Sequence, residues 1–100
     1  MIVVLWYTTE KGSNCPINDV ITDISDCIHA SKKLDFVCGG NNKCGTIKEH
    51  ADMPAGCFYT SRDHSSLNQV ILPDKTKPET HAGGICSMTS TYIHCLVLIG

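Results

Sequence analysis

The stretch Thr22–Leu34, with the sequence TDISDCIHASKKL, decides the fold because it is the segment with the clearest helical periodicity. Its apolar and small residues recur every three to four positions, which predicts a helix with one buried face. Those residues are Ile24, Cys27, Ile28, Ser31 and Leu34. Thr22 is suited to cap the N-terminus of this helix. Asp23 and Asp26 would lie in the first turn and Lys32–Lys33 in the last, which is favourable for the helix dipole at both ends.

Cysteine is the outstanding feature of the composition around this helix. The 100-residue chain contains seven cysteines but only six aromatic residues. A chain of this length forms one domain with a modest core, so disulfides are expected to supply stability that the core cannot. The cysteines are Cys15, Cys27, Cys38, Cys44, Cys57, Cys86 and Cys95. They predict a single disulfide-stapled domain over residues 1–100 that folds in an oxidising compartment.

The spacing of the cysteines favours disulfides over a metal site. Zinc sites place ligands in close pairs such as C-x2-C, and the chain has no such pair. Cys38 and Cys44 flank a loop rich in glycine and asparagine, which predicts a local disulfide between them. The odd count leaves one thiol over. Cys95 lies in an apolar run and is the predicted free thiol, buried as a small hydrophobe, with a reactive or intermolecular role as the alternative.

Short strands are predicted after the helix. Pro54–Gly56 is a turn that leads into a strand over Cys57–Tyr59. A polar turn over Ser61–Ser66 then precedes a second strand over Gln69–Leu72, so that the two strands form a hairpin. Ile85–Met88 begins a last ordered segment. The predicted fold class is therefore α+β: a small disulfide-rich domain in which one helix packs on a short antiparallel sheet.

Both ends of the chain are apolar. Met1–Tyr7 and Tyr92–Gly100 are too short to cross a bilayer, and we expect them to pair as central strands of one sheet. Met1–Tyr7 lacks the features of a signal peptide, so a targeting segment is expected to have been removed or to lie outside this sequence. Alternatively, segments 1–8 and 92–100 dock on a larger assembly or a membrane protein. The side chains that would then meet the partner are Ile2, Val4, Trp6, Leu96 and Leu98.

The charges and motifs argue against nucleic-acid binding and catalysis. The net charge is −2 and the eight Lys and Arg residues are scattered, so a basic patch is missing. The histidines, carboxylates and glycines show no zinc, EF-hand or phosphate-loop spacing. Asp63, His64 and Ser65–Ser66 are neighbours in one turn, whereas triad residues converge from separate elements. We expect a non-enzymatic domain without a metal, a cofactor or a small-molecule substrate.

Four short motifs occur in order along most of the chain. They are Gly12-Ser13-Asn14-Cys15, Ile21-Thr22 followed by Cys27, Ala30 and Leu34, Pro54-Ala55-Gly56-Cys57, and Gly84-Ile85-Cys86. In their order and spacing the chain resembles, from about Gly12 to Met88, a small cysteine-containing domain common in extracytosolic proteins of diatoms, dinoflagellates and haptophytes. The resemblance implies no chemistry. That family usually has a Tyr-Phe-Asn-like sequence in the second hairpin strand, where this chain has Asn68–Pro73.

The resemblance also implies which cysteines form the framework. The family's common cysteines would be Cys15, Cys27, Cys57 and Cys86, with Cys38 and Cys44 as an added pair and Cys95 unpaired. Four cysteines allow three connectivities. Of these we expect Cys15–Cys86 and Cys27–Cys57, because the second would join the helix to the hairpin.

Two non-enzymatic functions fit this chain. The first is a structural accessory subunit that binds protein partners through its apolar ends, in a larger assembly on a lumenal or extracellular face, with a membrane-bound complex as one such assembly. The resemblance implies the thylakoid lumen as one address, where the subunit would cap a photosystem or antenna complex. The second is a secreted or cell-surface binding module for glycans or a matrix partner. It would use the loops Arg62–Asn68 and Lys75–His81, with Trp6 and Tyr59 as its aromatic contacts.

Overall fold

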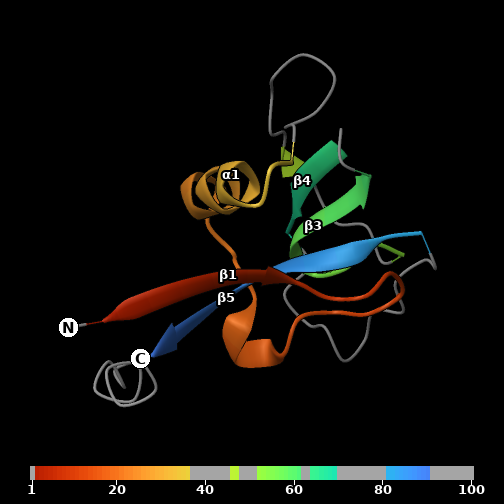
Figure 1. Cartoon of the computed structure of the whole chain (residues 1–100). Coiled ribbons are helices and arrows are strands. Elements are labelled where there is room, and N and C mark those ends of the chain that lie inside the picture. Colours follow the sequence, from red (N-terminus) through yellow and green to blue (C-terminus); the bar gives the residue numbers. More distant parts are fainter. Residues whose placement is uncertain (1, 37–45, 48–51, 62–63, 70–80, 91–100) are drawn as a thin grey trace.

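The fold is a helix packed on a sheet, as Figure 1 shows. The computed structural model describes residues 2–36, 46–47, 52–61, 64–69 and 81–90. In chain order these residues form β1 (Val3–Thr8), the 3-10 helix η1 (Ile17–Asp19), α1 (Ile24–Lys33), β2 (Thr46–Ile47), β3 (Gly56–Ser61), β4 (His64–Asn68) and β5 (Gly83–Ser90). The predicted α+β class is confirmed. The predicted helix is also confirmed, with ends that lie within the predicted range.

The sheet has the strand order β1-β5-β3-β4-β2, and all neighbours are antiparallel except the two-residue β2, which pairs in parallel with β4. β5 joins the two halves of the sheet. Its first residues, Gly83 and Gly84, pair with β3, and Ile85–Ser90 pair with β1. β1 and β5 thus form a two-stranded ribbon, and the N-terminal end of β1 extends beyond α1 (Figure 1).

The N-cap of α1 lies one residue later than predicted. Asp23, not Thr22, is the N-cap, and its side chain accepts a hydrogen bond of 3.1 Å from the backbone N–H of Asp26. The prediction of Thr22 was wrong because the first residue with helical backbone is Ile24, which places Asp23 at the capping position. Lys32 and Lys33 lie in the last turn, as expected.

The core lies between α1 and the middle of the sheet and is small. Its buried cluster consists of Ile21, Cys27, Ala30, Phe36, Cys57, Leu67 and Ile85. Polar groups reach into this layer, since the buried Ser65 hydroxyl of β4 donates a 3.0 Å hydrogen bond to the Ser31 hydroxyl of α1. Because no buried side-chain N or O atom of the described residues lacks a partner, the polar contribution to the core is fully satisfied.

Two disulfides cross-link the elements around this core. Cys15–Cys86 and Cys27–Cys57 are both formed, which confirms the expected pairing. They join residues separated by 71 and 30 positions, and closing loops of these lengths stabilises a fold by about 4 kcal/mol each in the chain-entropy account. The predicted Cys38–Cys44 bridge and the predicted free thiol of Cys95 lie outside the described residues.

The hairpin differs from its prediction. β4 begins at His64, so Ser61–Ser66 is not a turn, and only positions 62 and 63 separate β3 from β4. Gln69 follows the end of β4, and the remainder of the predicted strand Gln69–Leu72 lies outside the described residues. The two serines of β4 hid the strand because serine is typical of turns, whereas here both are buried. Ser65 faces α1, and Ser66, its neighbour in the strand, faces the opposite side of the sheet.

The N-terminal strand is confirmed, but among the described strands it does not have the central position expected for it. β1 pairs on one side only, with β5, and is an edge strand of the described sheet rather than a central one. A central strand would have both faces covered, yet Val4 and Leu5 are exposed. The C-terminal run Tyr92–Gly100, expected as its partner, lies outside the described residues.

The turn before β3 depends on Gly56. Its φ of +72° is in the left-handed region, and a Cβ atom at this position would lie 2.4 Å from the carbonyl oxygen of Ile21. Asn68 holds the same turn by donating from its side-chain amide to the carbonyls of Met53 and Pro54, at 3.2 and 3.0 Å. The turn therefore has no room for a side chain at Gly56.

We predict that Gly56→Ala lowers the free energy of unfolding by about 2–5 kcal/mol, because backbone strain and overpacking add at this position. Urea unfolding of the oxidised protein, followed by circular dichroism, measures the change. A loss below about 1 kcal/mol would show that Ile21 moves away without cost.

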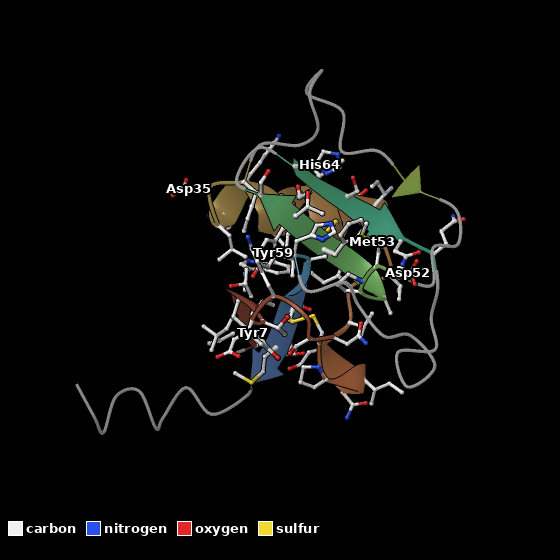
Figure 2. All side chains as sticks on the ribbon, turned by 90° about the vertical axis from the view of Figure 1, so that its right-hand side faces the viewer. Tyr7, Asp35, Asp52, Met53, Tyr59 and His64 are labelled. Carbon is white, nitrogen blue, oxygen red and sulfur yellow. A yellow bond between two sulfur atoms is a disulfide. The ribbon has the colours of Figure 1, made fainter. Side chains whose placement is uncertain are left out.

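The C-terminus of α1 is closed by a residue that is unusual for its position. Asp35 has a φ of 62°, and the N–H groups of Asp35 and Phe36 donate to the carbonyls of Lys32 and Ser31, at 3.3 and 2.8 Å. This is the Schellman arrangement, in which glycine is the usual residue at the left-handed position. The Asp35 side chain lies at the periphery of the molecule (Figure 2) and is exposed.

We predict that Asp35→Gly raises the free energy of unfolding by about 0.5–1 kcal/mol, since glycine adopts this conformation without the strain that a Cβ atom causes. The same urea titration measures the effect, and Asp35→Ala serves as the control because it retains the Cβ atom. An equal gain in both variants would assign the effect to the lost charge instead.

Candidate functional site

Exposed apolar side chains gather on the β1–β5 ribbon. Ile2, Val4 and Leu5 have 65%, 42% and 47% of their surface accessible, and Met88 on β5 has 41%. Leu5 and Met88 are directly opposite each other in the β1–β5 pairing, so they share one face of the ribbon. A cluster of this kind on a small domain is typical of a surface that binds another protein.

The predicted partner-binding residues differ in their exposure in the structure. Ile2 and Val4 are exposed as a docking surface requires. Trp6 is only partly exposed, because it packs against the core cluster and meets the His29 ring edge-on at a centroid distance of 5.5 Å. Leu96 and Leu98 lie outside the described residues.

Two members of the surface were missed at the sequence level. Leu5 lies in the same apolar run as Val4. Strand alternation places it on the face opposite Val4 and Trp6, so it was left out of a set chosen from their face. No sequence pattern pointed to Met88, because it joins these residues only through the register that pairs it with Leu5. Leu5 and Met88 lie on one face of the ribbon, and Ile2 and Val4 lie on the other. We refer to these four exposed side chains together as the apolar ribbon surface.

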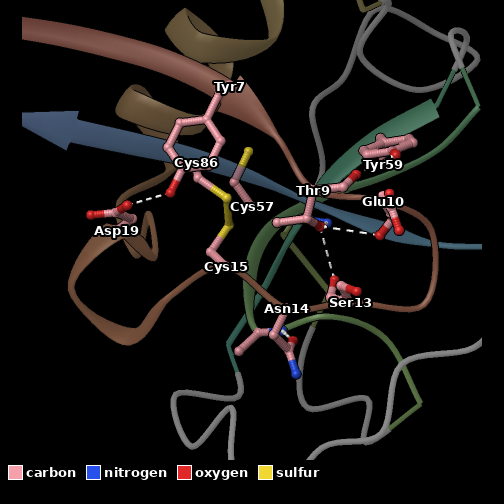
Figure 3. Close-up of a disulfide and its surroundings, with 12 residues drawn as sticks. Tyr7, Thr9, Glu10, Ser13, Asn14, Cys15, Asp19, Cys57, Tyr59 and Cys86 are labelled. Carbon is pink, nitrogen blue, oxygen red and sulfur yellow. Dashed lines mark hydrogen bonds between the residues drawn. A yellow bond between two sulfur atoms is a disulfide. The ribbon is translucent and has the colours of Figure 1, made fainter.

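The ribbon is fixed where it joins the rest of the domain. Figure 3 shows the Cys15–Cys86 disulfide beside the hydrogen bond that the Tyr7 hydroxyl donates to Asp19 of η1. Gly84 lies against the same disulfide, since a Cβ atom there would come within 2.7 Å of the Cys15 sulfur. The Thr9 hydroxyl accepts a 2.8 Å hydrogen bond from the Gly84 N–H and lies 3.0 Å from the Ser13 carbonyl. The base of the ribbon is thereby rigid.

The stability that Tyr7 contributes at the base of the ribbon depends on pH. Burial raises the pKa of Tyr7 to about 12, and the hydrogen bond to Asp19 and the Asp19 charge act in the same direction. The unfolded chain has the ordinary pKa of about 10, so it releases a proton between pH 10 and 12 that the folded chain retains. The stabilisation by Tyr7 is therefore complete below pH 10 and is lost as the pH rises towards 12.

We predict that Tyr7→Phe lowers the free energy of unfolding by about 1 kcal/mol near neutral pH, because one hydrogen bond is lost. The difference from the unsubstituted protein narrows as the pH approaches 12. Urea midpoints of the two proteins, compared at neutral pH and above pH 10, measure both effects. An unchanged difference across this range would contradict the role of the hydroxyl.

The aromatic residues expected to serve a binding module are used by the fold. The Tyr59 hydroxyl donates to the Thr9 carbonyl at 2.7 Å, and its ring meets Phe36 at a centroid distance of 5.1 Å. The ring also lies over Gly83, where a Cβ atom would come within 2.7 Å of it. Tyr59 therefore joins β3 to the base of the ribbon instead of forming an open platform, although a shallow hollow adjoins it.

The two proposed binding loops contribute little exposed surface among the described residues. Ser65–Asn68 is buried in β4, whereas His64 and His81 are exposed. The other positions of these loops lie outside the described ranges.

The described residues do not bring a catalytic or metal-binding set together. Cys15, Cys27, Cys57 and Cys86 are oxidised and are not available as thiolate ligands. Within the described ranges, no three His, Cys, Asp or Glu side chains are placed to hold a metal ion. None of the helices in this part of the chain combines the length and apolar composition that crossing a membrane requires.

Comparison with known proteins adds no relative. The chain matches no protein-family model, no curated protein and no solved structure at a significant level. Inference about function therefore depends on the surface of the molecule itself, and the apolar ribbon surface is its most distinctive part.

Proposed function

We propose that this protein is a non-enzymatic interaction subunit that binds a protein partner through the apolar ribbon surface. The observation that carries the proposal is that Leu5 and Met88 are both more than 40% exposed on a ribbon whose base is fixed by a disulfide. Exposed apolar groups on a rigid support lose little conformational freedom on binding, which favours association. The rest of the described surface offers no comparable cluster of exposed apolar strand residues.

The two disulfides indicate an oxidising, extracytosolic environment, because the cytosol keeps thiols reduced. Within that environment, the resemblance to algal extracytosolic domains supports the thylakoid lumen as the compartment. The subunit would there cap a membrane-bound photosystem or antenna complex, with the apolar ribbon surface against the complex. A secreted or cell-surface location is the alternative compartment for the same interaction.

The proposal is tested by native electrophoresis of mildly solubilised source material in which the chain carries an affinity tag. We expect the tagged protein to migrate with a larger assembly. Met88→Lys should reduce the co-migrating fraction about tenfold, because a charge on the apolar ribbon surface must be desolvated on binding.

Ile17→Lys is the matched control for this experiment. Ile17 is an apolar residue with 69% of its surface exposed, but it belongs to η1 and not to the ribbon. Its substitution should leave the co-migration unchanged. Recovery of the unsubstituted protein only as a free species, or an equal loss in both variants, would contradict the proposed surface.

A further inference from the structure

Among the described residues, the edge of β1 that faces away from β5 lacks the features that usually prevent an edge strand from pairing with another chain. Natural edge strands are protected by lysine, proline, bulges or an inward-pointing charge. Residues 2–9 read IVVLWYTT and contain neither a charged residue nor proline. The register between β1 and β5 runs without a shift from Val3 to Thr8, so the strand has no bulge. This edge is a regular, uncharged template.

The groups that β1 presents at the edge away from β5 follow from its bonds to β5. The Thr9 N–H donates to the Gly84 carbonyl at 3.0 Å, towards β5. Alternate residues of an antiparallel strand bond to the same neighbour, so the backbone of Val3, Leu5 and Tyr7 also faces β5. The N–H and C=O groups of the intervening residues Val4, Trp6 and Thr8 point away from β5, where no described strand pairs with them.

We propose that a second copy of this protein pairs with that edge, antiparallel, about a two-fold axis that passes beside Leu5. Val4 of each copy then lies opposite Trp6 of the other, and Ile2 lies opposite Thr8. The two sheets become one continuous sheet across the junction. This inference rests on the proposed function and names the partner that occupies the ribbon's edge.

The position of the axis follows from the length of the strand. An axis at Leu5 places the outward-facing residues of the two copies opposite one another and uses all residues from 2 to 8. Axes at Val4 or at Trp6 would also align the outward-facing groups, but each would leave two residues of this stretch unpaired. The register centred on Leu5 therefore satisfies the most backbone groups.

The same register covers the exposed apolar side chains. Leu5 of one copy lies directly opposite Leu5 of the other, and Met88 flanks each of them on β5. Four apolar side chains then form a row across four neighbouring strands, on the face that also carries Tyr7. On the other face Val4 packs against the partly exposed Trp6 of the second copy. Ile2, Val4 and Leu5 would lose solvent exposure to the second copy, and Met88 would stand at each end of the row.

Charge favours a second copy as the occupant. Two identical edges repel each other when they carry charge, and this edge carries none between positions 2 and 9. The whole chain has a net charge of only −2, so long-range repulsion between copies is also weak. The edge is thus compatible with itself in hydrogen bonding, in shape and in charge.

Sedimentation velocity of the oxidised full chain over a range of concentrations tests the inference. We expect a reversible monomer–dimer equilibrium. Leu5→Lys and Leu5→Glu each place like charges directly opposite one another and should weaken the dimer about tenfold or more, while circular dichroism shows that both variants remain folded. A mixture of the two variants should restore the dimer, because opposite charges then meet at the axis. Ile17→Lys should dimerise as the unsubstituted protein does.

Three results would overturn the inference: a protein that stays monomeric at every concentration, a dimer that Leu5→Lys does not weaken, or a mixture that does not recover. A monomeric chain whose Met88→Lys variant still leaves the larger assembly would overturn the second copy as partner but leave the proposed function standing. A dimer that Ile17→Lys disrupts and Leu5→Lys does not would place the interface away from the ribbon and overturn the inference, and an equal loss of Met88→Lys and Ile17→Lys from the larger assembly would contradict the proposed function as well.

Discussion

The Cys27–Cys57 disulfide joins α1 to β3 at the centre of a core that has few large side chains. Both cysteines are fully buried, and the remaining members of the cluster lie around them. Apolar burial on this scale leaves little surplus over the conformational entropy of a 100-residue chain. The covalent bond removes part of that entropy from the unfolded state, so the helix can stay on the sheet with a thin core. Reduction of this bond would return that entropy to the unfolded state and so destabilise the contact between the helix and the sheet.

The elements that could be predicted from sequence are those with a strong local signal. The helix followed from its apolar spacing, and the turn before β3 followed from Pro54-Ala55-Gly56, whose glycine has a positive φ. β4 could not be predicted, because Ser65 and Ser66 are polar and the burial of Ser65 depends on a hydroxyl of α1 that is distant in the sequence. The position of β1 at the edge of the sheet was equally inaccessible, since strand order is set by tertiary pairing and not by local pattern.

The candidate surface was only partly visible in the sequence for a related reason. An apolar strand such as β1 has the same composition whether both of its faces are covered or one edge is open. Ile2 and Val4 were found because they lie in that run, whereas Met88 enters the surface only through its register with Leu5. The two aromatic residues predicted to contact a ligand, Trp6 and Tyr59, instead pack within the fold. Trp6 contacts His29, and Tyr59 contacts Phe36 and lies over Gly83. Their large side chains therefore join neighbouring elements of the fold.

The placement of the Cys15–Cys86 bridge at the base of the ribbon has a consequence for how the protein can evolve. The bridge, the Tyr7–Asp19 hydrogen bond and Gly84 hold the base, while the far ends of β1 and β5 make no contribution to the buried cluster. Substitutions near Ile2 or Met88 can therefore alter recognition with little loss of stability. Selection on binding and selection on folding act on separate residues of the same two strands, which leaves the recognition end free to diversify.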